Sequence, residues 1–122
     1  MASDTRHRDW LLRLTLVEGV GPIIGRRLIE AFGSPAGAFD ATPADLESVR
    51  GIGATKARAI FRGLHDSADL LEKELALADR SGVHILALGE PDYPPLLAQI
   101  PDAPLVLYSR GRPPSDGADY AV

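Results

Sequence analysis

The sequence has 122 residues, 45% of them hydrophobic and none of them cysteine. This length allows one small domain, or one domain and part of another, and the lack of cysteine excludes disulfides and thiolate chemistry. The net charge of −4 argues against a strongly basic nucleic-acid binder. No apolar run is long enough to span a membrane and the start lacks the apolar segment of a signal peptide, so we expect a cytoplasmic protein without membrane contact.

Apolar residues at helical spacing predict a series of short helices in the first half. The series covers residues 5–17, 22–33, 34–39, 42–49 and 55–64. Pro22 suits a first helical position, where the missing N–H is tolerated, and Gly33 suits a helix end. These elements follow one another too closely to leave room for a strand.

From residue 67 onward the pattern changes. A longer helix is predicted over residues 67–80, ended by Ser81-Gly82. Its apolar side chains expected to face inward are Leu70, Leu71, Leu75 and Ala78. Short strands are predicted at residues 83–88, 105–108 and 120–122, with at most one or two helical turns at 96–99. So few elements cannot cover both faces of a sheet, and the second half is expected to be incomplete or to lean on the helices.

A glycine-containing segment occurs twice, at residues 18–28 and again at residues 50–60. The two copies pair Gly19 with Gly51, Gly21 with Gly53, Gly25 with Ala57, Arg26 with Arg58 and Leu28 with Ile60. Each copy predicts a helix, a tight turn of glycine, hydrophobe and glycine, and a second helix. The pattern resembles a tandem helix-hairpin-helix unit.

The chemistry of these turns favours contact with phosphate. The glycines allow positive φ and close approach, while Val20 and Ile52 between them are expected to enter the core. The helix after each turn exposes unpaired N–H groups and its positive dipole end. We therefore predict sequence-independent, salt-sensitive contacts with phosphate. The residues predicted to make them are Gly19, Gly21, Arg26, Gly51, Gly53, Lys56 and Arg58. Arg27 is a further cation beside the first hairpin.

The charge distribution limits the strength of these contacts. Residues 1–68 carry nine Arg and Lys against eight Asp and Glu, a net of +1, whereas residues 69–122 carry four against nine, a net of −5. Phosphate contact therefore belongs to the first half and is expected to be modest. The second hairpin is expected to be the stronger, because the first has Ile24 where the second has Lys56.

Two other interpretations of the glycines are open. The turns can simply join packed helices, in which case the helical domain is a protein-interaction or dimerisation module with no DNA binding of its own. Gly19, Gly21 and Gly25 also approximate a dinucleotide-binding motif. That motif requires a preceding strand, and here the preceding segment is helical and the third glycine is one place late.

No arrangement of residues indicates an enzyme. The histidines His7, His65 and His84 lack metal-ligand spacing, so we expect no metal and no cofactor. Asp92 and Asp102 lie in proline-rich turns, where aspartate usually caps the local backbone. Tyr93 and Tyr108 could stack on bases, but packing is the more typical role of aromatic residues in such positions.

Two segments together resemble the N-terminal part of the DNA-processing protein A (DprA/Smf) family. One is the double hairpin region at residues 14–64. The other is the segment at residues 89–111, which matches the family's pattern at Tyr93-Pro94, Leu97, the strand Pro104–Tyr108 and Arg110-Gly111. The resemblance covers nearly the whole chain, and the second segment makes it more specific than the hairpins alone.

The resemblance implies a fold and a function. It implies an α+β chain with a SAM-like tandem helix-hairpin-helix domain at residues 1–66, a connecting helix at 67–82 and the first strands of an incomplete Rossmann-like domain at 83–122. It also implies binding of single-stranded DNA and help in loading RecA during natural transformation. The family's main DNA-binding and RecA-binding residues would follow Val122, so neither activity is expected on a residue of this chain. A homodimer is a further possibility.

Overall fold

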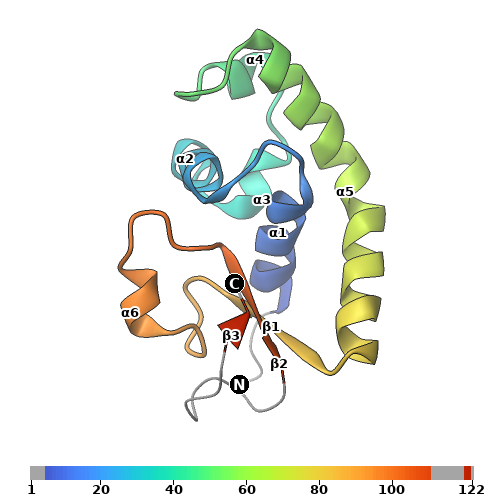
Figure 1. Cartoon of the computed structure of the whole chain (residues 1–122). Coiled ribbons are helices and arrows are strands. Elements are labelled where there is room, and N and C mark those ends of the chain that lie inside the picture. The colour runs from blue at the N-terminus through green and yellow to red at the C-terminus, as the bar shows by residue number, and fades with distance from the viewer. Residues whose placement is uncertain (1–4, 111–119, 122) are drawn as a thin grey trace.

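The computed structural model describes residues 5–110 and 120–121. The first part is helical, with α1 (Thr5–Leu16), α2 (Pro22–Phe32), α3 (Pro35–Ala38), α4 (Pro43–Glu47) and α5 (Ala54–Arg80). The rest contains β1 (Val83–Ala87), α6 (Pro95–Ala98), β2 (Val106–Arg110) and β3 (Tyr120–Ala121). The helices stand together and the small sheet lies at one end of them (Figure 1). The α+β class is confirmed, and none of the helices described here is both long and apolar enough to cross a membrane.

The strands form one antiparallel sheet in the order β1-β2-β3. Val83 faces Arg110 and Ala87 faces Val106, so β2 extends two residues beyond the predicted end at Tyr108 to pair with the start of β1. A Rossmann-like domain is built on parallel strands joined by helices. Among the described strands no parallel pair occurs, so the Rossmann-like continuation stays a prediction.

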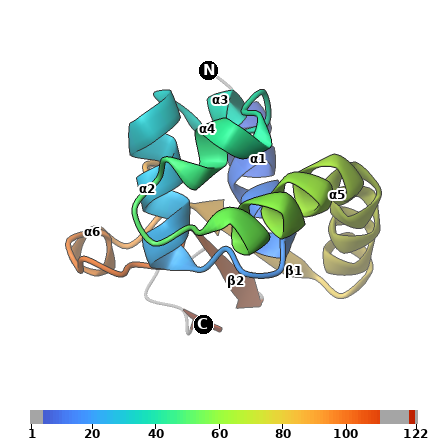
Figure 2. The same cartoon turned by 90° about the horizontal axis from the view of Figure 1, so that it is seen from above.

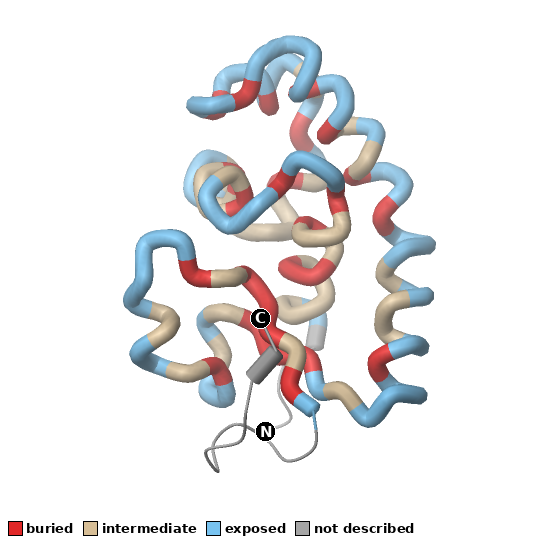
Figure 3. Tube along the Cα trace, in the orientation of Figure 1, coloured by how far each residue is buried: buried red, intermediate tan, exposed pale blue. Residues whose placement is uncertain are grey.

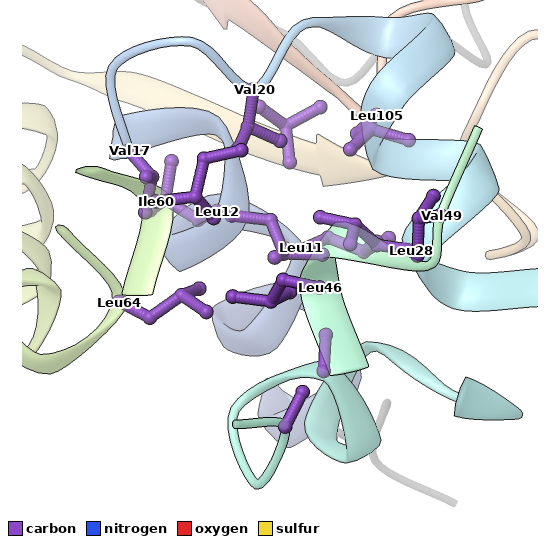
Figure 4. Packing of buried hydrophobic residues seen from close by; sticks show 14 of the residues in the cluster. Leu11, Leu12, Val17, Val20, Leu28, Leu46, Val49, Ile60, Leu64 and Leu105 are labelled. Atoms are coloured by element: carbon purple, nitrogen blue, oxygen red, sulfur yellow. The ribbon is translucent and has the colours of Figure 1, made fainter. Parts of the chain in front are cut away.

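Helix α1 is the centre of the packing. It contacts α2, α3 and α5 as well as β1 and β2. Its side chains Leu11, Leu12 and Leu14 are almost completely buried and belong to one core cluster. In this cluster Leu11 and Leu12 lie among Leu28, Leu46, Ile60, Leu64 and Leu105 (Figure 4). Burial of a leucine side chain contributes about 2 kcal/mol, so this cluster is the main stabilising element of the helical part.

The predicted break between residues 64 and 67 is wrong, because α5 runs without interruption from Ala54 to Arg80. Ser67 lies in the middle of this helix, fully buried, and its hydroxyl donates a hydrogen bond of 2.7 Å to the Leu64 carbonyl. A serine in this position satisfies its hydroxyl within the helix and does not begin a new one. The predicted domain boundary at residue 66 thus falls inside a helix, and the domain division itself stays a prediction.

The inward face of the second half of α5 also differs from the prediction. Leu70 is 43% exposed, whereas Ser67 and Ala78 are buried and Leu71 and Leu75 are partly buried. The buried stripe follows from Ile60 and Leu64 at helical spacing, and Leu70 lies one residue off that stripe. The continuity of the helix therefore decides which leucines face the core.

Arg13 joins α1 to α5. Its Nε donates to Ser67 Oγ over 3.0 Å and its Nη2 donates to the Leu64 carbonyl over 3.3 Å. Its guanidinium also lies 4.3 Å from the ring centre of Phe39 and 5.0 Å from that of Trp10. Partial burial lowers the pKa of this group, although arginine stays charged at any ordinary pH.

We expect Arg13→Ala to lower the free energy of unfolding by about 2 kcal/mol, because charged hydrogen bonds and stacking on two rings are lost together. Urea unfolding followed by circular dichroism measures the difference. Arg80→Ala is the control, since Arg80 is exposed in the last turn of α5. A loss for Arg13→Ala no larger than that for Arg80→Ala would show that the contact does not stabilise the fold.

Candidate functional site

The two predicted hairpins have the same backbone geometry. The first glycine of each has a positive φ, +92° at Gly19 and +93° at Gly51. The second glycine of each is extended, with φ of −93° at Gly21 and −89° at Gly53, and directly precedes a helix. The repeat seen in the sequence is therefore a repeat of backbone conformation, and the positive φ explains why the first position holds glycine.

The apolar residue between the glycines is buried in both copies, as predicted. Val20 is 6% exposed and Ile52 is 5% exposed, while the four glycines around them are exposed (Figure 3). Each hairpin is thus held in the core by its middle residue and presents its glycines to the surface.

The hairpins lie next to each other on one side of the molecule (Figure 2). Arg27 in α2 donates a hydrogen bond of 3.0 Å from Nη1 to the Arg50 carbonyl, just before the second hairpin. A methyl group placed on Gly19 would lie 3.7 Å from Cε of Lys56, so this lysine from α5 reaches the first hairpin. Because each repeat sends a cation toward the other, the two hairpins form one continuous surface, which we call the hairpin surface.

Helices α2 and α5 both begin at this surface without a side-chain cap. The first N–H groups of an uncapped helix lack intrahelical partners and can bind an anion. Helix α2 loses one of these donors to Pro22, whereas α5 begins with Ala54, Thr55 and Lys56 and keeps all of them. Exposed Glu18 also places a negative charge beside the first hairpin. Both features make the second hairpin the better anion site.

The predicted cations do not all lie on the hairpin surface. Lys56 does, whereas Arg58 is exposed farther along α5. Arg26 is partly buried in a cavity between α2 and the segment after β1, and its Nε has no hydrogen-bond partner among the described residues. The structure therefore brings the four glycines and Lys56 together and places Arg26 elsewhere.

Two arginines lie on the hairpin surface besides Lys56. Arg27 was predicted as a further cation, whereas Arg50 was not among the predicted residues. Arg50 is exposed immediately before Gly51, and Arg27 bonds to its carbonyl. The position of Arg50 at the start of the second copy was a signal in the sequence. The role of Arg27 depends on the contact between the two repeats, which no local pattern encodes.

Tyr93 and Tyr108 are packing residues, which confirms the more typical interpretation. Tyr93 is 3% exposed and its hydroxyl donates to the Pro104 carbonyl over 2.8 Å. The Tyr108 hydroxyl donates to Glu74 Oε2 over 2.6 Å and so links β2 to α5. Burial and the Glu74 carboxylate raise the pKa of Tyr108 well above its ordinary value. Within residues 5–110, the structure brings no three potential metal ligands together.

We expect Gly51→Ala to destabilise the protein by about 1–2 kcal/mol, because the left-handed conformation strains a residue with Cβ. The added methyl group would also lie 2.7 Å from Nη1 of Arg27 and disturb its bond to the Arg50 carbonyl. Gly53→Ala is the matched control, since Gly53 has negative φ and no atom within 4 Å of the new methyl group. Equal unfolding midpoints for the two variants in urea would contradict the strained geometry at Gly51.

Comparison with known proteins agrees with this geometry. The SAM-like helix-hairpin-helix tandem family matches residues 11–66, which include both hairpins. Protein Smf of Synechocystis sp. is 35% identical over 98 residues, which cover 79% of this chain and 24% of the relative. The chain thus spans about a quarter of the length of that relative. The resemblance to the N-terminal part of the DNA-processing protein A (DprA/Smf) family seen in the sequence is confirmed by this relative and by the helix-hairpin-helix match.

Proposed function

We propose that this chain takes part in DNA processing and that its hairpin surface holds the DNA backbone without reading sequence. The observation that carries the proposal is the pair of adjacent hairpins with matching backbone geometry and uncapped helix starts. A surface made of backbone N–H groups and exposed glycines fits phosphate oxygens closely, since no side chain stands in the way. It offers nothing that distinguishes one base from another.

The proposed contacts divide between the two hairpins. Gly53 and the first residues of α5 supply N–H donors to one phosphate, with Lys56 and Arg50 as nearby cations. Gly21 and the start of α2 supply fewer donors to a second phosphate, with Lys56 close to both. With so few cations on an acidic chain, binding is weak and falls as salt rises. Arg26, partly buried in its cavity, contributes less than the other predicted residues.

The similarity to Protein Smf extends the proposal beyond this surface. It supports single-stranded DNA as the ligand, assistance to RecA loading as the role, natural transformation as the setting and the cytoplasm as the location. The chain spans about a quarter of Protein Smf, so these activities are proposed for a protein of that length. The hairpin surface would add sequence-independent backbone contacts to it.

We expect Lys56→Glu to weaken DNA binding by about fivefold to tenfold, since one phosphate contact is replaced by a repulsion. It also reduces the dependence of log K on log salt by about one unit. Fluorescence anisotropy with a labelled oligonucleotide at several salt concentrations measures both. Lys73→Glu is the control, because it makes the same charge change on an exposed residue of α5, about 25 Å farther along the helix. If both variants bind like the wild type, the hairpin surface does not contact DNA.

A second candidate function is self-association. Leu77 is 51% exposed and Leu70 is 43% exposed, and they lie two turns apart on the outward side of α5. Two such helices could bury these leucines against each other.

For self-association we expect light scattering at high protein concentration to give a mass above 13.0 kDa, and the double change Leu70→Glu and Leu77→Glu to restore the monomer mass. Lys73→Glu on the same helix serves as the control for added negative charge. A wild-type chain that stays monomeric at high concentration would exclude this candidate.

A further inference from the structure

A pocket lies on α5 beyond the second hairpin. Helix α4 packs against α5 in this region (Figure 1). Its volume is about 440 Å³. It is lined by Pro43, Arg58, Phe61, Arg62, His65 and Asp66. All of these residues belong to α4 or α5, and Arg58, Arg62 and His65 are exposed.

The first repeat contains the corresponding pocket. A cavity of about 410 Å³ lies on α2. The alignment of the two glycine segments pairs four residues that line this cavity with four residues that line the pocket on α5. The pairs are Leu11 with Pro43, Arg26 with Arg58, Ile29 with Phe61 and Glu30 with Arg62. The two pockets are therefore copies of one feature of the repeat.

In the first repeat, the chain itself supplies the opposite wall of this pocket. Leu88, Gly89 and Ala98 line it, and His7 Nε2 forms a hydrogen bond of 2.9 Å with the Leu88 carbonyl. Nearby, Leu105 lies so close to α2 that a methyl group on Gly25 would be 2.5 Å from the Leu105 Cδ1 atom. The position paired with Gly25 in the second repeat holds Ala57, which already has such a methyl group. No segment outside α4 and α5 lines the second pocket within the described part of the chain.

The lining of the second pocket is more aromatic and more positively charged than that of the first. Where the first pocket has an isoleucine and a glutamate, the second has Phe61 and Arg62. The Phe61 ring packs edge-on against His65, with centroids 4.5 Å apart. Besides Arg58 and Arg62, the lining contains one acidic residue, Asp66. The first pocket suits a neutral segment of protein, whereas the second is cationic and aromatic.

We propose that the pocket on α5 binds one nucleotide of single-stranded DNA, with its base against Phe61 and His65 and its phosphate beside Arg58 and Arg62. This inference rests on the proposed function, because the pocket lies one to three turns along the helix that begins at the second hairpin. A strand held by the hairpin surface can therefore continue into it. Bases of a single strand are free to stack on aromatic side chains, and those of a duplex are not.

The test converts the second pocket into the first. The double change Phe61→Ile and Arg62→Glu places the residues of the first repeat at the matching positions, where the repeat already tolerates them. Wild type, this variant, Lys56→Glu and the control Lys73→Glu are each titrated with a labelled oligothymidylate and with a duplex of equal length at one salt concentration. Circular dichroism confirms that each variant is folded.

We expect the pocket variant to lose at least about fivefold in affinity for the single strand and clearly less in affinity for the duplex. A loss of about fivefold is the lower end of the effect of removing one stacked base. Unchanged single-strand affinity in the pocket variant, with Lys56→Glu still weakened, overturns the pocket and leaves the hairpin surface intact. Equal losses for single strand and duplex also overturn it, because they indicate charge alone. If wild type binds neither DNA, both proposals fail.

Discussion

The burial of one apolar side chain at each hairpin is the constraint on which the rest of this structure depends. Val20 and Ile52 must enter the core, and the chain must reverse direction on either side of them. Only a backbone with positive φ at the preceding glycine makes that reversal so short. As a result the next helix begins at the surface, with its first N–H groups outward. A packing requirement thus produces a surface that suits phosphate.

The sequence was most informative where the structure is local and repeated. The hairpins, the burial of Val20 and Ile52 and the strand at Val83–Ala87 all follow from glycine placement and short-range periodicity. The continuity of α5 could not be predicted in this way. Ser67 is of a residue type that often begins helices, but a contact from Arg13, more than fifty positions earlier, holds it inside one. The wrong side assigned to Leu70 follows from the same error.

The candidate site was predictable to a similar degree. Glycine spacing identified the four glycines and Lys56, which lie together on the hairpin surface. It could not place Arg26, although Arg26 and Arg58 occupy matching positions in the repeat. What separates them is the segment after β1, which covers the first repeat and encloses Arg26. The surroundings of a side chain in a repeat depend on what packs against each copy, and this information lies in distant parts of the chain.

This asymmetry gives the two copies of the repeat different surroundings. In the first copy the outer pocket is covered by the turn after β1 and by α6, and Gly25 leaves room for Leu105 to approach. No such segment lines the pocket of the second copy within the described residues, and that pocket has Phe61 and Arg62 where the first has Ile29 and Glu30. The overall negative charge of the chain makes such local concentration necessary. Long-range attraction to DNA is weak here, so any binding must come from short-range contacts at the hairpin surface and along α5.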